Sequence, residues 1–330
     1  MGEIAVSVLC TAYNHERYIR KCLEGFVRQK TNFTYEVLVN DDASTDATAS
    51  IIHEYERAYP NIIKPIYQSD NLFSKGVSIT RNVLFPKSQG KYIAICEGDD
   101  YWTDPYKLQK QIDALEKNKD CSMCVCKVKR VSEDETQVVG YCPDFPLDEG
   151  VIASETFLNI VFKKYAFHTS SYVFRADLFK ECVGNSTEFV QVCPVGDEAY
   201  MLYFGYAGNV YYCKDTMSAN RRGSIGGWNE RTWSDQNRRR RYYEGMAKTY
   251  ECFDEFTGGK YHPQCNQRIF MENYLMAEST KEFMRLLTAK EHTFFKQSLR
   301  MKTRILLGAF CNPLLKLYYI IAKRINRANG

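Results

Sequence analysis

The chain has 330 residues, of which 45% are hydrophobic and 25% charged, a composition that excludes disordered and fibrous proteins and allows one large domain or two smaller ones. Its thirteen cysteines follow no secretory signal, which predicts reduced thiols and a cytoplasmic protein. The net charge is +4, but residues 281–330 alone carry eleven Lys and Arg against two Glu, so the rest of the chain is acidic.

The first third of the chain alternates strand and helix patterns. The predicted strands are 5–13, 35–44, 62–68 and 91–96, and the predicted helices are 17–29, one through Tyr55, 79–84 and 108–115. Ser44 and Thr45 are the candidate N-caps of the second helix, and Pro65 favours an edge position for the third strand. This order predicts an α/β fold with a doubly wound, mostly parallel sheet that helices cover on both faces.

After about Arg130 the pattern loosens, and from Asp235 onward the chain reads as helices. We therefore expect a first domain at 1–236 and a helical C-terminal region at 237–330. Within that region, residues 300–327 are both basic and apolar, but they are interrupted by Asn312, Pro313 and Lys316. A segment lying in a membrane interface and a helix packed on the domain explain this composition equally well.

Carboxylates gather where two predicted strands end. Asp41 and Asp42 close one strand, and Glu97, Asp99 and Asp100 close another. Because ligands bind beyond the carboxyl ends of such strands, and crowded carboxylates need a cation, we expect a Mg²⁺ or Mn²⁺ site that a diphosphate completes. Capping of the helix that follows Asp104 would explain that acid, but it would not explain Glu97, Asp99 and Asp100.

Other readings of the sequence are weaker. The first strand is followed by TAYNHERY, with neither a Walker loop nor G-x-G-x-x-G, which argues against P-loop hydrolases and Rossmann dehydrogenases. Cys121, Cys124 and Cys126 lie in an alternating run, which indicates buried strand cysteines rather than a zinc site. Arg238 to Arg241 form a run of cations that fits either a solvated helix face or an anionic ligand.

Four ordered blocks resemble one family of enzymes. They are VSVLCTAYNHERYIRKCLEG, VLVNDDASTDAT, SDNLFSKGVSITRN and EGDDYW. The sequence resembles family 2 glycosyltransferases of the kind found in bacterial surface-polysaccharide biosynthesis. The resemblance covers roughly residues 4–235 and implies the glycosyltransferase A fold, with a nucleotide-sugar half at 1–115 and an acceptor half at 116–236. It also implies inverting transfer from a nucleotide-sugar, usually linked to UDP, to a hydroxyl of a glycan or lipid-linked glycan.

The resemblance also implies roles for single residues. Asp42, with Asp41, would meet the uracil; Arg81 would pair with Asp42 or a phosphate, or form a structural ion pair; Glu97, where the family usually has Asp, would hold the ribose; and Asp99 would bind the metal. Asp100 and Trp102 would form the floor beneath the sugar. The implied nucleotide-binding set is Thr11, Ala12, Tyr13, Asn14, Asp41, Asp42, Arg81, Glu97 and Gly98.

The downstream half would supply the base and a lid. Asp197 is the first candidate for the general base and Glu198 the second, with a helix N-terminal acid as the plainer alternative. Residues 216–228 resemble a flexible loop over the diphosphate, in which Arg221 and Arg222 would neutralise charge. The His that the family often has there as a metal ligand is absent. His168 fits a structural role better than a contact with the ligand.

Two rival functions stay open from sequence. A sugar nucleotidylyltransferase shares a related architecture but would need a glycine-rich, basic first loop. A nucleic-acid binder could use the basic C-terminus, but we expect no nucleic-acid partner because the acidic strand ends would repel a polyanion. We expect a cytoplasmic enzyme, with membrane contact through 300–327 as the peripheral alternative.

Overall fold

The computed structural model describes residues 3–163, 166–184, 187–224, 232–280 and 299–310. The chain divides into two compact units, one formed by 1–191 with 195–227 and the other by 192–194 with 228–330. The first unit carries a sheet and the second is helical in its described part.

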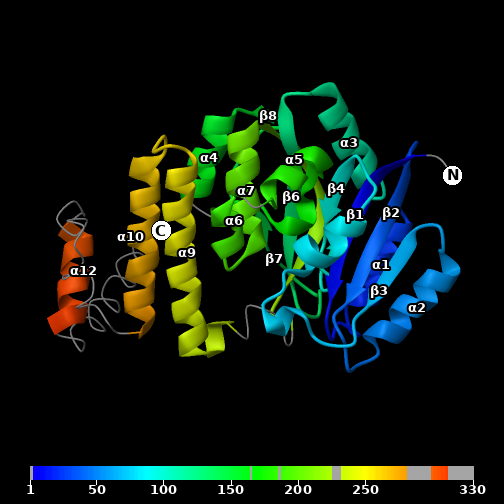
Figure 1. Ribbon diagram of the computed structural model, residues 1–330, viewed down its shortest axis with the longest axis horizontal. Helices are drawn as coiled ribbons and strands as arrows, with labels where there is room; N and C mark the ends of the chain where they lie inside the picture. Colours follow the sequence, from blue (N-terminus) through cyan, green and yellow to red (C-terminus); the bar gives the residue numbers. More distant parts are fainter. Residues whose placement is uncertain (1–2, 164–165, 185–186, 225–231, 281–298, 311–330) are drawn as a thin grey trace. The chain divides into compact units, whose positions relative to one another are not determined.

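Ten strands of the described chain form one sheet (Figure 1). Their order is β3-β2-β1-β4-β9-β6-β10-β5, with β7 paired to β6 and β8 to β10. The bounds are β1 Ile4–Ala12, β2 Thr34–Asp41, β3 Ile63–Tyr67, β4 Tyr92–Ile95, β5 Tyr101–Trp102, β6 Cys121–Ser132, β7 Val138–Cys142, β8 Gly150–Ile152, β9 Val173–Arg175 and β10 Asn209–Arg222.

The N-terminal half of the sheet is parallel, as the sequence predicts. Strand β1 pairs in parallel with β2 and β4, and β2 pairs in parallel with β3. β3 is the outermost strand of this half, which confirms the edge position that Pro65 indicates. The carboxyl ends of β1, β2 and β4 therefore meet at one edge of the sheet.

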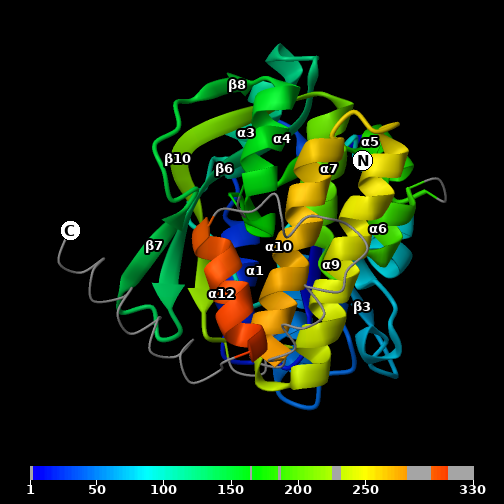
Figure 2. The ribbon, with the colours of Figure 1, turned by 90° about the vertical axis from the view of Figure 1, so that its left-hand side faces the viewer.

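The second half of the sheet is mixed. β9 runs antiparallel to both β4 and β6, and β5 and β8 run antiparallel to β10. β10 is 14 residues long and curves beside β6 (Figure 2). This corrects the expected lid at 216–228, because residues up to Arg222 are paired with β6 as strand and residues 225–231 lie outside the described chain.

Helices cover both faces of the sheet. The longer helices of this unit are α1 Ile19–Val27, α2 Thr48–Ala58, α3 Lys107–Lys117, α4 Ser154–Lys163, α5 Ala176–Cys182, α6 Glu188–Val192 and α7 Gly196–Ala207. Short turns are η1 Phe73–Lys75, η2 Thr80–Leu84, η3 Phe85–Lys87 and η4 Thr169–Ser171. Alternate β1 residues such as Val6 and Val8 pack with Phe26 of α1 and Leu108 of α3 in one core.

The opposite face of the sheet is covered by aromatic residues. Phe174 of β9 stacks on Phe204 of α7 at 4.1 Å between ring centroids, and Phe179 of α5 packs against both rings. Because both faces are covered, the central strands have few exposed positions and read as nearly continuous apolar runs. The three β6 cysteines, Cys121, Cys124 and Cys126, are buried core residues, as predicted.

One helix start differs from the prediction. α2 begins after Ala47, and no side chain caps it. Ser44 and Thr45, the predicted caps, instead bond to Asn14: the Asn14 amide donates to Ser44 Oγ at 2.9 Å, and the Thr45 amide donates to Asn14 Oδ1 at 2.8 Å. The predicted N-cap was wrong because Ser44 and Thr45 are hydrogen-bonded to Asn14, in the segment that follows β1.

The second unit contains α9 Gln236–Phe256, α10 His262–Thr280 and α12 Leu299–Phe310. Phe270, Tyr274 and Ala277 of α10 form an apolar cluster with Ile305 of α12. Among the described residues, no helix has the length and apolar character needed to span a membrane. Residues 311–330, most of the basic apolar segment, lie outside the described residues.

Candidate active site

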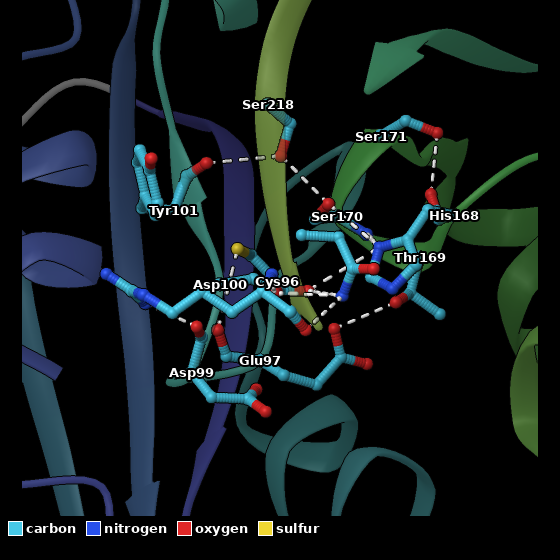
Figure 3. A network of polar contacts seen from close by, with 12 residues as sticks. Cys96, Glu97, Asp99, Asp100, Tyr101, His168, Thr169, Ser170, Ser171 and Ser218 are labelled. Carbon is cyan, nitrogen blue, oxygen red and sulfur yellow. Dashed lines mark hydrogen bonds and ion pairs between the residues drawn. The ribbon is translucent and has the colours of Figure 1, made fainter. Parts of the chain in front are cut away.

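A tight turn follows β4 and carries the acidic motif (Figure 3). The Asp100 amide donates to the carbonyl of Glu97 at 3.0 Å, and the Gly98 amide donates to the carbonyl of Thr11 at 2.9 Å. A Cβ on Gly98 would come within 2.9 Å of side-chain atoms of His15 and Ile19. Gly98 therefore lets the turn lie close against the end of β1.

Asp100 is a buried acid with structural partners. It is 2% exposed, and its Oδ1 accepts from the Arg221 amide at 2.9 Å and from Asn220 Nδ2 at 3.1 Å. Burial, with the nearby charges of Asp99 and Glu97, raises its pKa well above the usual range. Asp100 thus joins the β4 turn to β10, and its expected place in the floor beneath the sugar stays a prediction.

Glu97 lies at the centre of the described acids. Thr169 Oγ1 donates to its Oε2 at 2.8 Å (Figure 3). Burial raises its pKa to about 7; the Thr169 bond opposes this, and the charges of Asp99 and Asp197 add to it. The charge of Asp197, in the first turn of α7, thus acts on Glu97 although the two residues are far apart in sequence.

This raised pKa predicts a pH-dependent stability effect for Glu97→Gln. Burial makes ionised Glu97 less favourable in the folded than in the unfolded state. The free energy of unfolding of wild type therefore falls as pH rises from about 4.5 to about 7. Because the side chain is partly exposed, we expect the variant to gain about 1–2 kcal/mol relative to wild type between pH 4.5 and pH 8, measured by urea unfolding with EDTA.

The matched control for that experiment is Glu116→Gln. Bonds from Lys119, Lys91 and Tyr92 lower the pKa of Glu116 to about 2, so its charge stabilises the fold and the variant should lose stability at pH 8. A difference between Glu97→Gln and wild type that stays constant with pH would contradict a raised pKa at Glu97.

Asp99 differs from the other acids of this turn, because its carboxylate has no partner among the described residues. Its side chain is partly exposed, and no hydrogen bond or ion pair within the described ranges reaches its carboxylate oxygens. In those ranges no three His, Cys, Asp or Glu side chains are grouped as a metal cage. A single oxygen ligand fits Mg²⁺ or Mn²⁺ that arrives with a diphosphate and keeps water ligands, as these ions commonly do.

The two acids at the end of β2 have different surroundings. Asp42 accepts from the backbone amides of Leu72 and Phe73 at 2.9 and 3.0 Å, so both its oxygens hold the start of η1. Asp41 is 3% exposed, and its Oδ1 has no hydrogen-bond partner among the described residues. Burial raises the pKa of Asp41, bonds from Ser44 lower it, and the charges of Asp46 and Asp42 raise it further. Asp41 therefore keeps a buried oxygen without a partner among the described residues, whereas both oxygens of Asp42 are bonded.

The other predicted nucleotide residues lie at the same edge. Thr11 and Ala12 end β1, and Asn14 follows with a positive φ of 54°. Arg81 belongs to η2 and donates from Nη1 to the carbonyl of Val190 at 2.8 Å. No ion pair joins Arg81 to Asp42 among the described residues, where Asp42 accepts from backbone amides, and pairing of Arg81 with a phosphate stays a prediction.

Asp197 and Glu198 occupy the first turn of α7. Glu198 is buried at 4% exposure, whereas Asp197 is partly exposed and its Oδ1 accepts from the Glu198 amide at 2.9 Å. The geometry therefore favours Asp197 over Glu198 as the acid that a ligand could reach.

Trp102 and His168 both contact the η4 turn. Trp102 is 4% exposed, packs edge-on against Phe26, and donates from Nε1 to the carbonyl of Ser170 at 3.0 Å. His168 Nδ1 accepts from the Ser170 amide and caps η4, and burial lowers its pKa to about 4. Trp102 therefore belongs to the core, and its expected place in the floor beneath the sugar stays a prediction, whereas His168 has the expected structural role.

The two predicted arginines are placed differently. Arg221 is 4% exposed and bonds to Glu135 in the turn between β6 and β7, whereas Arg222 is exposed. Arg130 of β6 was missed by sequence reasoning; its charge and that of Arg222 both act on His168. The alternation of CKVKRV could have indicated it, since Arg130 is paired with Asn220 on the face that meets Asp100.

Sequence comparison identifies the family. The family model described as Glycosyl transferase family 2 matches residues 7–172. Rv1520, an uncharacterized protein of Mycobacterium tuberculosis, is 32% identical over 263 residues, which cover 77% of this chain and 69% of the relative.

Two solved structures share the fold. S. aureus TarS 1-349 in complex with UDP-GlcNAc aligns with a TM-score of 0.56 at 18% identity, covering 86% of this chain and 81% of that one. The mannosyltransferase PcManGT from Pyrobaculum calidifontis, in complex with GDP-Man and Mn²⁺, aligns with a TM-score of 0.54 at 16% identity, covering 93% and 80%. The fold is thus the glycosyltransferase A fold, with a helical C-terminal region. The chain belongs to glycosyl transferase family 2 and is a glycosyltransferase.

Proposed function

We propose that the protein transfers one sugar, with inversion, from a UDP-sugar to a hydroxyl of a glycan or lipid-linked glycan. The observation that carries this proposal is the β4 turn, in which Asp100 and the backbone are bonded while the Asp99 carboxylate is left available. A carboxylate presented in this way, beside the ends of β1 and β2, fits a metal-bound diphosphate.

Asp41 supports uridine as the base of the donor. Its buried Oδ1 has no partner among the described residues, and a carboxylate oxygen can accept from the ring N–H of uracil. The similar structures contain different donors, UDP-GlcNAc in S. aureus TarS and GDP-Man in PcManGT, so the fold fits either a uridine or a guanosine nucleotide. We assign the uracil contact to Asp41, while Asp42 orders the η1 segment beside it.

The divalent cation would be held by Asp99. When bound, the ion would neutralise negative charge on the diphosphate and so make it a better leaving group. Arg222 is exposed, and its charge and that of Arg130 both lower the pKa of His168, so these two cations are the candidates to bind phosphate oxygens from the protein side. Arg221 is already bonded to Glu135.

The reaction is a direct displacement. The acceptor oxygen forms a bond to the anomeric carbon on the face opposite the diphosphate, the bond from that carbon to the phosphate oxygen breaks, and UDP leaves with its electron pair. Asp197 takes the proton of the acceptor hydroxyl, which is worth about 10²–10⁴ in rate. Membrane contact through 300–327 remains part of this proposal, for a lipid-linked acceptor at the cytoplasmic surface.

The test is calorimetric titration of wild type and Asp99→Asn with UDP and GDP, each with Mn²⁺ and with EDTA. We expect UDP to bind more tightly with Mn²⁺ than with EDTA. In Asp99→Asn this Mn²⁺-dependent increase in UDP affinity should be about 10–100-fold smaller, because a ligand carboxylate is removed. Asp177→Asn, at the exposed start of α5, is the control and should bind as wild type does.

Stereochemistry provides the second measurement. Incubation with UDP-GlcNAc and UDP-glucose, followed by proton NMR of the released or transferred sugar, should show the β anomer first. Failure of folded wild type to bind either nucleotide would overturn the proposed donor site, and an α product would overturn inversion.

A further inference from the structure

We propose that Glu135, in the turn between β6 and β7, is a positioning residue that orients Asp99 through Arg221. The inference rests on the proposed function, because it takes Asp99 to be the residue that meets a nucleotide-bound divalent cation. Glu135 lies outside the motifs that resemble the family, and its link to Asp99 exists only in the folded chain.

The Arg221 guanidinium is fixed on all sides. Its Nε and Nη2 donate to Glu135 Oε1 at 3.0 and 2.5 Å. Its Cζ lies 5.1 Å from the centroid of the Tyr18 ring and 4.7 Å from that of the Tyr101 ring. An arginine whose side chain is 2% exposed needs a carboxylate partner, because a buried unpaired charge is costly. Glu135 is the carboxylate that pairs with it.

The same arginine holds the β4 turn. Nη1 of Arg221 donates to the backbone carbonyl of Asp99, and its backbone amide donates to Asp100 Oδ1. The other side of that peptide is held as well, since the Asp100 amide donates to the carbonyl of Glu97. With the peptide plane after Asp99 held from both ends, the direction in which Asp99 presents its carboxylate is limited to its own side-chain rotamers.

Glu135 is itself held in place. Its amide donates to the carbonyl of Ser132 at 2.9 Å, its φ is 61°, and its Oε2 bonds to Lys21 Nζ. Burial tends to raise its pKa, but the bonds from Lys21, Arg221 and Tyr101 outweigh burial and leave the pKa below its usual value. Glu135 is therefore negatively charged at neutral pH and can fix Arg221 by charge as well as by geometry.

The alternative is that Glu135 only attaches the hairpin to α1. Glu133 provides the comparison, because it lies in the same turn and accepts from Tyr18 Oη at 2.7 Å and from Arg17 at 3.0 Å. No bond links Glu133 to Arg221 in the described chain. If attachment of the hairpin were the whole role, removing either charge would have the same effect.

The experiment is UDP titration by calorimetry, with EDTA and with Mn²⁺, on wild type, Glu135→Gln and Glu133→Gln, each checked for folding by circular dichroism and thermal unfolding. We expect Glu135→Gln to keep the wild-type UDP affinity in EDTA and to lose about tenfold of the affinity gained with Mn²⁺, because residues that orient a metal ligand have effects of this size. Glu133→Gln should keep the wild-type gain.

Glu135→Asp is the second variant, which keeps the charge and shortens the side chain by one methylene. It should fold and show a smaller loss of the gain, and it decides the question if Glu135→Gln is unfolded. A wild-type gain in a folded Glu135 variant, or equal losses in the Glu133 and Glu135 variants, would overturn the inference and leave the proposed function standing. Absence of Mn²⁺-dependent UDP binding in wild type would instead remove the proposed donor site on which the inference rests.

Discussion

Asp197→Asn should lower kcat by about 10²–10⁴ while leaving the affinity for UDP with Mn²⁺ unchanged. The physical reason is that asparagine keeps the shape of the side chain and its bond from the Glu198 amide but cannot accept the proton of the acceptor hydroxyl. The measurements are the rate of UDP release with a UDP-sugar, taken with saturating donor, and calorimetric UDP binding.

Asp177→Asn is the matched control for this variant. Asp177 lies in the first turn of α5, and its Oδ1 accepts from the Leu178 amide at 2.8 Å, just as Asp197 accepts from the Glu198 amide. If Asp197 were only an acid that stabilises a helix start, both variants would cost a few tenths to about 1 kcal/mol of stability and leave kcat unchanged. Equal kcat in wild type and Asp197→Asn would end its assignment as the base.

Asp41→Asn and Asp42→Asn should separate binding from stability. Asp41→Asn should weaken UDP binding by about 1–3 kcal/mol, since an unpartnered buried oxygen would lose its charge-assisted bond to the base, and should change folding little. Asp42→Asn should lower the free energy of unfolding by about 2–4 kcal/mol, because one of two bonded backbone amides loses its acceptor and the other loses a charged one.

Calorimetry with UDP and urea unfolding are the two measurements for this pair. Each variant serves as the control for the other, because the two residues are neighbours, both are 3% exposed and both replacements remove one charge. If Asp42→Asn lost UDP affinity with unchanged stability, the uracil contact would move to Asp42, as the resemblance first implied.

The order of strands and helices in the first 117 residues was predictable because it depends on local patterns. The strands predicted at 5–13 and 91–96 became β1 and β4 within one residue at each end, and the one predicted at 35–44 became β2, which ends three residues earlier, at Asp41. The apolar helix faces pack where their spacing indicates. The N-cap of α2 was not predictable in this way, because Ser44 and Thr45 are bonded to Asn14, about 30 positions earlier.

The second half was predicted less well because its pairings are not local. β9 inserts between β4 and β6, and β10 pairs with β6 across some 90 residues, so neither follows from a short window of sequence. The expected lid was partly strand for this reason. Its glycines and polar residues suggested a loop, but Asn220 and Arg221 are held by β6 and by Asp100.

By itself the sequence determined the family, the α/β order and the positions of the acids at the ends of β2 and β4, because short motifs and hydrophobic periodicity are local properties. Only the tertiary structure decided which acid of each pair has an oxygen that no described residue bonds. Asp42 and Asp100 are bonded by groups about 30 and 120 positions away, and Asp41 and Asp99 keep free oxygens among the described residues. Adjacent carboxylates look alike in a sequence, and burial and distant hydrogen bonds make them different.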